Sequence, residues 1–203
     1  MLVLLELKMI NVLTNDLLFY NGIAQLLKPA GAKVHHSATD NIESTSLSHK
    51  TSLIIIDMHG LLYNLEEMLA TVKVLTEKYP YAKVMIVANR INKVTKNTLH
   101  KFNKTMSVVT AESFFNYCIT RFSQKNKFSP KNPLGNEQTA LTKREIQVLK
   151  YVATGKSLKT ISRVTNLNEK TISYYKCSIM RKYGCTNMVE FKMLMEELGY
   201  HSF

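Results

Sequence analysis

The sequence has no tryptophan, only three cysteines and few of the motifs that mark enzymes or metal sites. The cysteines form no CxxC pair, which argues against a disulfide framework or a zinc site. None of the six histidines stands at metal-ligand spacing from a cysteine or an acid. Neither GxGxxG nor GxxxxGK[ST], the loops that hold nucleotide phosphates, occurs. We therefore expect no metal, no cofactor and no enzymatic activity.

Long apolar runs are also missing. No stretch reaches the ~18 apolar residues that a transmembrane helix needs. The apolar start of the chain is interrupted at Glu6, Lys8 and Asn11, and no positively charged region precedes it, as one would in a signal peptide. These features predict a soluble, cytoplasmic protein with no membrane partner.

Acidic residues are scarce relative to basic ones. The 203 residues include 27 Lys and Arg against 15 Asp and Glu, a formal net charge of +12. Hydrophobic residues make up 45% and charged residues 21%, which is typical of a globular protein. A chain of this charge attracts polyanions such as nucleic acid. The positions of the basic residues in the sequence indicate which part of the chain would bind them.

The composition changes near residues 124–140, which hold two of the four prolines and no apolar periodicity. Such a stretch is typical of a linker. Short β-branched runs alternate with helical patterns before it, whereas only helical periodicity follows it. We therefore predict a first domain over 1–123, a linker over 124–139 and a second domain over 140–203.

The first domain alternates candidate strands and helices. The third and fourth strands are nearly continuous apolar runs, as expected for parallel strands covered on both faces. This alternation predicts an α/β fold with a five-stranded, doubly wound parallel sheet. The expected strands are 9–14, 32–36, 52–57, 83–88 and 105–109, and the expected helices are 16–28, 64–78, 92–103 and 111–122.

The carboxyl ends of these strands, where such folds place their sites, make the domain resemble a response-regulator receiver. In that family an acidic pair ends the first strand, a phosphate-accepting Asp the third, Ser or Thr the fourth and Lys the fifth. Here Asp57 alone keeps the family residue. The other positions hold Thr14, Asn15, Ala88 and Thr110.

The resemblance therefore implies a pseudo-receiver. A lone carboxylate without Mg²⁺ or a cation beside it is a poor phosphoryl acceptor, and the nearest other acid, Asp16, falls one position late. We interpret Asp57 as a vestigial phosphoacceptor position in a fold kept for dimerisation or partner contact. Regulation by phosphorylation of Asp57 is the alternative.

The second domain divides into four helices, because helix-capping residues and glycines alternate along it. Thr142 and Glu145 have the spacing of a capping box. The second and third helices are joined by a short turn, as in a helix-turn-helix. The expected caps are Thr142, Ser157, Asn168 and Asn187, and the expected stops are Gly155, Gly184 and Gly199. Val164 is expected to face the core.

The basic residues concentrate on this domain. Residues 143–182 carry ten basic and two acidic side chains, a local net charge of +8. The third helix has a seam expected to be buried at Ile172, Tyr175, Ile179 and Tyr183. Its opposite face mixes cations with short polar groups and suits a DNA major groove, although a solvated helix face is the plainer alternative. That face consists of Lys170, Ser173, Tyr174, Cys177 and Arg181.

The stretch LTKREIQVLKYVATGKSLKTISRVTNLNEKTISYYKCSIMRKYG closely resembles the LuxR/FixJ/NarL-type DNA-binding domain. The resemblance covers about 60 residues, and it implies which side chains contact DNA. Base-reading positions map to Ser173, Tyr174 and Cys177. Phosphate or flanking contacts map to Lys156, Ser157, Lys159, Thr171, Lys176 and Lys182.

The stretch departs from the family at three positions. Tyr175 stands where the family often has His, and Cys177 where many members have Lys. Tyr174 is bulky, and it either stacks on a thymine methyl group or crowds the groove.

Degenerate receivers joined to such a domain resemble the auxiliary regulators of the enterobacterial Rcs type. This resemblance implies that a related response regulator is the partner.

The sequence thus predicts a bacterial transcription regulator that binds double-stranded DNA in the major groove. It would act without phosphorylation, as a homodimer or as a heterodimer with a related regulator. The alternative is an interaction protein that sequesters a partner regulator and does not itself read bases.

Overall fold

The fold comes from a computed structural model that describes residues 9–39, 46–58, 64–88, 91–103, 106–123 and 139–201. The chain divides into two compact units. The first, the sheet unit, comprises Met1–Leu61, Leu69–Ile91 and Asn103–Leu134. The second, the helical unit, comprises Leu62–Met68, Asn92–Phe102 and Gly135–Phe203. Most of the predicted linker, residues 124–138, lies outside the described residues.

The sheet unit contains the predicted five-stranded parallel sheet, in the order β2-β1-β3-β4-β5. This order is one of the two common doubly wound arrangements. The continuous apolar runs of β3 and β4 are buried, as expected for strands covered on both faces. The strands are β1 Met9–Leu13, β2 Lys33–Ser37, β3 Leu53–Asp57, β4 Lys83–Val87 and β5 Ser107–Val109.

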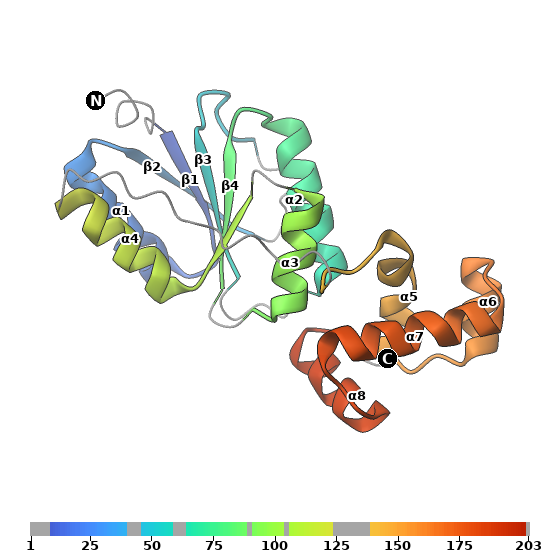
Figure 1. The fold of residues 1–203 in the computed structure, drawn as a ribbon. Coiled ribbons are helices and arrows are strands. Elements are labelled where there is room, and N and C mark those ends of the chain that lie inside the picture. Colours follow the sequence, from blue (N-terminus) through green and yellow to red (C-terminus); the bar gives the residue numbers. More distant parts are fainter. Residues whose placement is uncertain are drawn as a thin grey trace. The chain divides into compact units, whose positions relative to one another are not determined.

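Helices cover both faces of this sheet (Figure 1). Helix α1 (Leu17–Leu27), which continues into a short 3-10 helix at Lys28–Ala30, lies with α4 (Ala111–Ser123) on one face. Helix α2 (Leu65–Lys78) lies on the other face. Between the sheet and the α1–α4 layer is an apolar core that includes Ile10, Val12, Ile23, Ile55, Val87 and Phe114.

The helical unit contains the four helices predicted for the second domain. Helix α7 packs against α5 and α6, and α5 also contacts α8. The side chains of Leu149, Ile161, Ile172, Ile179 and Phe191 are almost wholly buried among them. The helices are α5 Lys143–Ala153, α6 Leu158–Thr165, α7 Glu169–Tyr183 and α8 Met188–Glu197.

Helix α3 (Lys93–Phe102) groups with the helical unit, as does the start of α2. The backbone N–H of Leu141 donates a 2.9 Å hydrogen bond to the hydroxyl of Thr98 on α3. The hydroxyl of Tyr200, after α8, donates to the carboxylate of Glu66 on α2. The grouping by contacts thus differs from the expected division at 123 and 140, and that boundary stays a prediction. No helix in the described part of the chain is long and apolar enough to cross a membrane.

Candidate nucleic-acid interface

The turn between α6 and α7 is held by side chains on both sides. The hydroxyl of Ser157 accepts a hydrogen bond from the Thr160 N–H and caps the start of α6. Asn166 ends α6 in the left-handed region, at φ 55°, which an asparagine adopts more readily than most residues. The amide oxygen of Asn168 then accepts from the Thr171 N–H at 2.7 Å and starts α7. A turn of three residues therefore joins two capped helices, the arrangement of a helix-turn-helix.

Helix α7 has one face toward the core and one toward solvent. Ile172, Ile179 and Tyr183 are buried as expected, whereas Tyr175 is only half-buried. The core-facing side also buries Ser178, a position that the apolar pattern did not reveal. On the opposite side, Ser173 is half-buried and four further side chains are exposed. These are Lys170, Tyr174, Cys177 and Arg181.

Tyr174 is the large apolar side chain on this outer face. It is 65% exposed. Its ring meets the ring of Tyr175 edge-on, with centroids 5.8 Å apart and an interplanar angle of 63°. Such a contact restricts where the Tyr174 ring can lie, because aromatic pairs favour this geometry. The outer face of α7 therefore presents an aromatic ring of limited freedom between cations.

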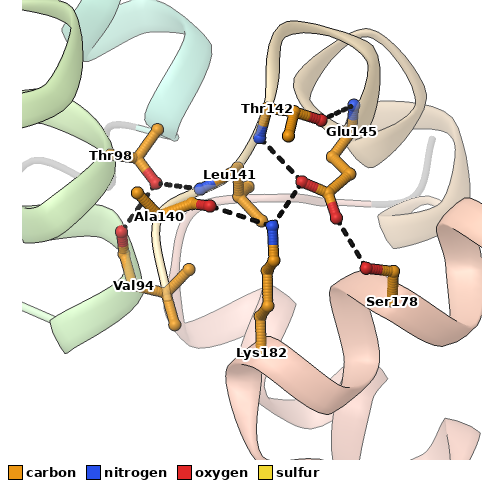
Figure 2. A network of polar contacts seen from close by, with 8 residues as sticks. All are labelled: Val94, Thr98, Ala140, Leu141, Thr142, Glu145, Ser178 and Lys182. Carbon is orange, nitrogen blue, oxygen red and sulfur yellow. Dashed lines mark hydrogen bonds and ion pairs between the residues drawn. The ribbon is translucent and has the colours of Figure 1, made fainter. Parts of the chain in front are cut away.

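A polar network centred on Glu145 ties α7 to the start of α5 (Figure 2). Glu145 is 3% exposed, and its carboxylate accepts three hydrogen bonds. Lys182 donates from Nζ at 2.6 Å, Ser178 from its hydroxyl at 2.7 Å and Thr142 from its backbone N–H at 2.7 Å. The Thr142 hydroxyl accepts in return from the Glu145 N–H at 3.2 Å, which completes the predicted capping box.

The network also sets the charge state of Glu145. Burial alone would raise the pKa of its carboxyl group, but the hydrogen bonds from Lys182, Ser178 and Thr142 outweigh burial and lower the pKa below the ordinary value of 4.5. The carboxylate therefore stays ionised and keeps the ammonium of Lys182 close. Because Ser178 and Lys182 lie on α7, the network fixes this helix against α5.

The sequence-predicted DNA contacts fall in two groups. Lys156, Ser157 and Lys159 are exposed around the start of α6, and Thr171 and Lys176 are half-buried on α7. Lys182 differs from all of these, because its side chain is 17% exposed and its ammonium is bonded to Glu145 and to the carbonyl of Ala140. The structure therefore gives the Lys182 ammonium partners inside the protein.

The Asp57 position lies where the sheet order reverses, between β1 and β3. Leu13 is in register with Ile56, so Thr14 and Asp57 follow on adjacent strands. Asp57 is 2% exposed, and the hydroxyl of Thr14 donates a 2.6 Å hydrogen bond to its Oδ2. A threonine hydroxyl thus contacts the carboxylate at the place where a receiver has its acidic pair.

The neighbouring polar groups are engaged in local structure. The carboxylate of Asp16 caps α1 by accepting from the N–H groups of Leu18 and Phe19. Asn15 accepts from the Thr39 N–H, and Thr110 bonds to Ser113. Within the described ranges, no three His, Cys, Asp or Glu side chains gather in a group that could hold a metal ion.

Besides Tyr175 and Ser178 on α7, sequence reasoning missed or misjudged three features. Glu145 was expected only as part of a cap, because its contacts with Ser178 and Lys182 join residues 33 and 37 positions apart on different helices, which a helical pattern does not reveal. The Thr14–Asp57 bond depends on sheet register, which the sequence does not specify. Val164 was expected to be inward but is 54% exposed, and Thr165 is buried in its place.

Comparison with known proteins matches residues 139–195 to the family described as bacterial regulatory proteins, luxR family. The Fimbriae Z protein of Salmonella typhimurium is 34% identical over 89 residues, which are 44% of this chain and 41% of that protein. The Fimbriae Z protein of Escherichia coli is 29% identical over an equally long stretch. The match thus spans about two-fifths of the length of these relatives.

Solved structures resemble the chain over nearly its whole length. RcsB from Salmonella enterica serovar Typhimurium bound to promoter rprA aligns with a TM-score of 0.56 at 16% identity, over 93% of this chain and 98% of its own. A complex of the two-component response regulator RcsB with DNA gives 0.53 at 18% identity, over 94% and 98%. At these identities the likeness concerns the fold.

The matched family is described as one of bacterial regulatory proteins. Residues 139–195 are thus similar to the bacterial regulatory proteins of the luxR family, and the chain shares the fold of the response regulator RcsB.

Proposed function

We propose that this protein is a bacterial transcription regulator that binds specific DNA sequences through the α6–α7 pair. The observation that carries the proposal is the outer face of α7, where Lys170, Tyr174, Cys177 and Arg181 are exposed together. Residues 143–182 have a net charge of +8, and the one ion pair within them that lies inside the protein, Glu145 with Lys182, removes one charge of each sign. The exposed excess of cations therefore remains available to phosphates.

The residues divide by role. Ser173, Tyr174 and Cys177 on the outer face of α7 would contact base edges, because short polar and apolar groups read the major groove. The cations and the exposed ends of the two helices would contact phosphates, which fix register without reading sequence. These phosphate contacts are Lys156, Ser157, Lys159, Lys170, Thr171, Lys176 and Arg181. Lys182 would position α7 through Glu145.

Selection from random-sequence duplexes with the purified chain tests base reading. Enrichment of a sequence motif supports the proposal. The salt dependence of binding then tests a phosphate contact, because each lost contact lowers the slope of log K against log salt by about 0.9. We expect this loss for Lys176→Ala and no change for Lys83→Ala, which removes the same charge from an exposed position of the sheet unit. Equal slopes for both variants would contradict the phosphate contact.

We further propose that the protein acts without phosphorylation of Asp57. The Asp57 carboxylate is buried and accepts from Thr14, and the positions of the family's hydroxyl and lysine hold Ala88 and Thr110. Phosphoryl transfer to a carboxylate depends on a metal ion and a cation that neutralise the developing charge. Acetyl phosphate with Mg²⁺ should therefore leave the intact mass unchanged, and stoichiometric addition of a phosphoryl group at Asp57 would refute this.

The proposed assembly is a homodimer, or a heterodimer with a related response regulator that has a competent receiver, acting in the cytoplasm. Selection with and without such a partner separates the two assemblies. Enrichment only with the partner indicates a heterodimer, and enrichment without it a homodimer. No enrichment in either arm would favour the second function, in which the protein sequesters a partner regulator without reading bases. The observation that favours this second function is Cys177, at a position where many members of the resembled family have lysine.

A further inference from the structure

The middle of the exposed face of α7 is apolar, although both of its ends are cationic. Lys170, Tyr174, Cys177 and Arg181 follow at intervals of four, three and four residues and therefore lie on one line along the helix. The two central members carry no charge. Tyr174 is also the most exposed of the large hydrophobic side chains on α6 and α7.

The groups that read bases by paired hydrogen bonds are missing from this centre. Arg and Lys recognise guanine, Asn and Gln recognise adenine, and Asp and Glu recognise cytosine. The nearest amide, Asn168, uses its side-chain oxygen to cap α7. The nearest acid, Glu169, is offset from Lys170 by about 100° around the helix, since α-helices have about 3.6 residues per turn. Along this line, only Lys170 and Arg181 at its two ends are of a type that recognises a base by paired hydrogen bonds.

Tyr174 and Cys177 have the spacing to face neighbouring base pairs. Three residues of α-helix rise about 4.5 Å, and stacked base pairs are about 3.4 Å apart. The edge-on contact with Tyr175 restricts the Tyr174 ring, while the small, exposed thiol of Cys177 leaves space beside it. The two side chains therefore lie next to each other on the exposed line, a large ring beside a small thiol.

We propose that Tyr174, with Cys177 beside it, reads the 5-methyl group of thymine. Thymine alone among the four bases presents a methyl group in the major groove, and apolar surface favours burial against apolar surface. The inference rests on the proposed function, in which α7 enters the major groove. It names the base feature that the centre of the helix recognises, whereas Lys170 and Arg181 at the ends of the line contact phosphates.

The experiment uses the full chain and the duplex obtained by random-sequence selection. Each thymine of that duplex is replaced in turn by deoxyuridine, which removes the methyl group and leaves every hydrogen-bonding group in place. We expect binding to weaken about fourfold for each methyl group that contacts the protein, the effect of one buried carbon, at one position or two adjacent positions in each half-site. At such a position 5-methyl-dC should bind more tightly than dC.

Three variants assign the effect to the ring of Tyr174. Tyr174→Ala should bind thymine and deoxyuridine duplexes equally, whereas Tyr174→Phe should keep the difference because it removes the hydroxyl only. Tyr81→Ala, an equal change at a tyrosine that is 93% exposed in the sheet unit, should behave as the wild type. Because Tyr174 is itself exposed, its variants should keep the same far-ultraviolet circular dichroism spectrum.

Several outcomes would overturn the proposal. Deoxyuridine without effect at every position, or an equal effect in Tyr174→Ala, would show that Tyr174 reads no methyl group. Loss of the difference in Tyr174→Phe would show that the ring alone does not read the methyl group and that the hydroxyl is required. A selection that enriches no sequence would refute the proposed function itself, whereas enrichment with methyl-insensitive binding would refute this inference alone.

Discussion

Replacement of Glu145 by alanine should destabilise the helical unit more than any cap mutation does. The variant removes the acceptor of three hydrogen bonds, from Lys182, Ser178 and the Thr142 N–H. It leaves the ammonium of Lys182, whose side chain is 17% exposed, with the carbonyl of Ala140 as its acceptor. It also leaves the buried hydroxyl of Ser178 without its acceptor carboxylate.

The size of the effect follows from these contacts. Removing one partner of a buried ion pair typically costs about 3–5 kcal/mol, because the other charge is left uncompensated. We expect the lower end, about 3 kcal/mol, since the Lys182 side chain already reaches solvent in part. Thr142→Ala is the matched control, because it removes the cap hydroxyl but keeps the Glu145 carboxylate, and should cost about 1 kcal/mol.

Hydrogen exchange measured by mass spectrometry on the full chain gives the local stability of α5 and α7. Because about 1.36 kcal/mol corresponds to a factor of ten, Glu145→Ala should speed exchange of the slowest amides in these helices roughly a hundredfold. Thr142→Ala should speed it roughly fivefold. Exchange in the sheet unit should serve as the internal reference.

Acid provides a second measurement on the same variant. The folded-state pKa of Glu145 lies below 4.5, so its stabilisation is complete above that pH and is lost as the pH falls through the folded pKa. The difference between wild type and Glu145→Ala should therefore shrink on acidification below about 4.5. Two results would contradict this role of the network in holding α7. One is that Glu145→Ala speeds exchange no more than Thr142→Ala does. The other is that the difference in exchange between wild type and Glu145→Ala does not change with pH.

Two further perturbations test other buried groups. Burial raises the pKa of Tyr183 to about 12 from its ordinary 10.0, so its neutral phenol stabilises the helical unit fully below pH 10 and this stabilisation is lost as the pH rises through the folded pKa. Alkaline denaturation of Tyr183→Phe should accordingly be less steep than that of wild type, and identical curves would contradict the assignment. Thr14→Val removes a hydrogen bond to the buried Asp57 carboxylate and should lower the free energy of unfolding, measured in urea, by about 1.5–3 kcal/mol. Thr14→Ser keeps a hydroxyl and should retain most of the stability. A loss in Thr14→Ser as large as that in Thr14→Val would contradict a role for the hydroxyl.

The elements of this fold were predictable because their signals are local. The apolar runs of β3 and β4 mark parallel strands, and the caps at Ser157 and Asn168 mark where α6 and α7 begin. Each cap depends on residues three positions apart, so the sequence contains both partners. Val164 shows the limit of such signals, because α6 is short and its periodicity leaves the last turn ambiguous.

The candidate site depends both on local sequence pattern and on tertiary packing. The basic residues and the pattern of α7 already indicated a nucleic-acid surface, since one helix face is set by spacing alone. The sequence pattern did not show which of those cations are available to bind phosphates, because this depends on tertiary contacts. Lys182 and Glu145 are 37 positions apart, and only packing of α7 against α5 brings them together.

By itself, the sequence determined the order and type of the elements, the exposed face of α7 and the identity of the residues around Asp57. These follow from periodicity, capping and residue identity, which act over a few positions. The tertiary structure decided that Lys182 pairs with a buried carboxylate, that Thr14 bonds to Asp57 and that α3 groups with the helical unit. Those outcomes depend on contacts between residues far apart in the chain, because register and helix packing determine which polar groups meet once water is excluded.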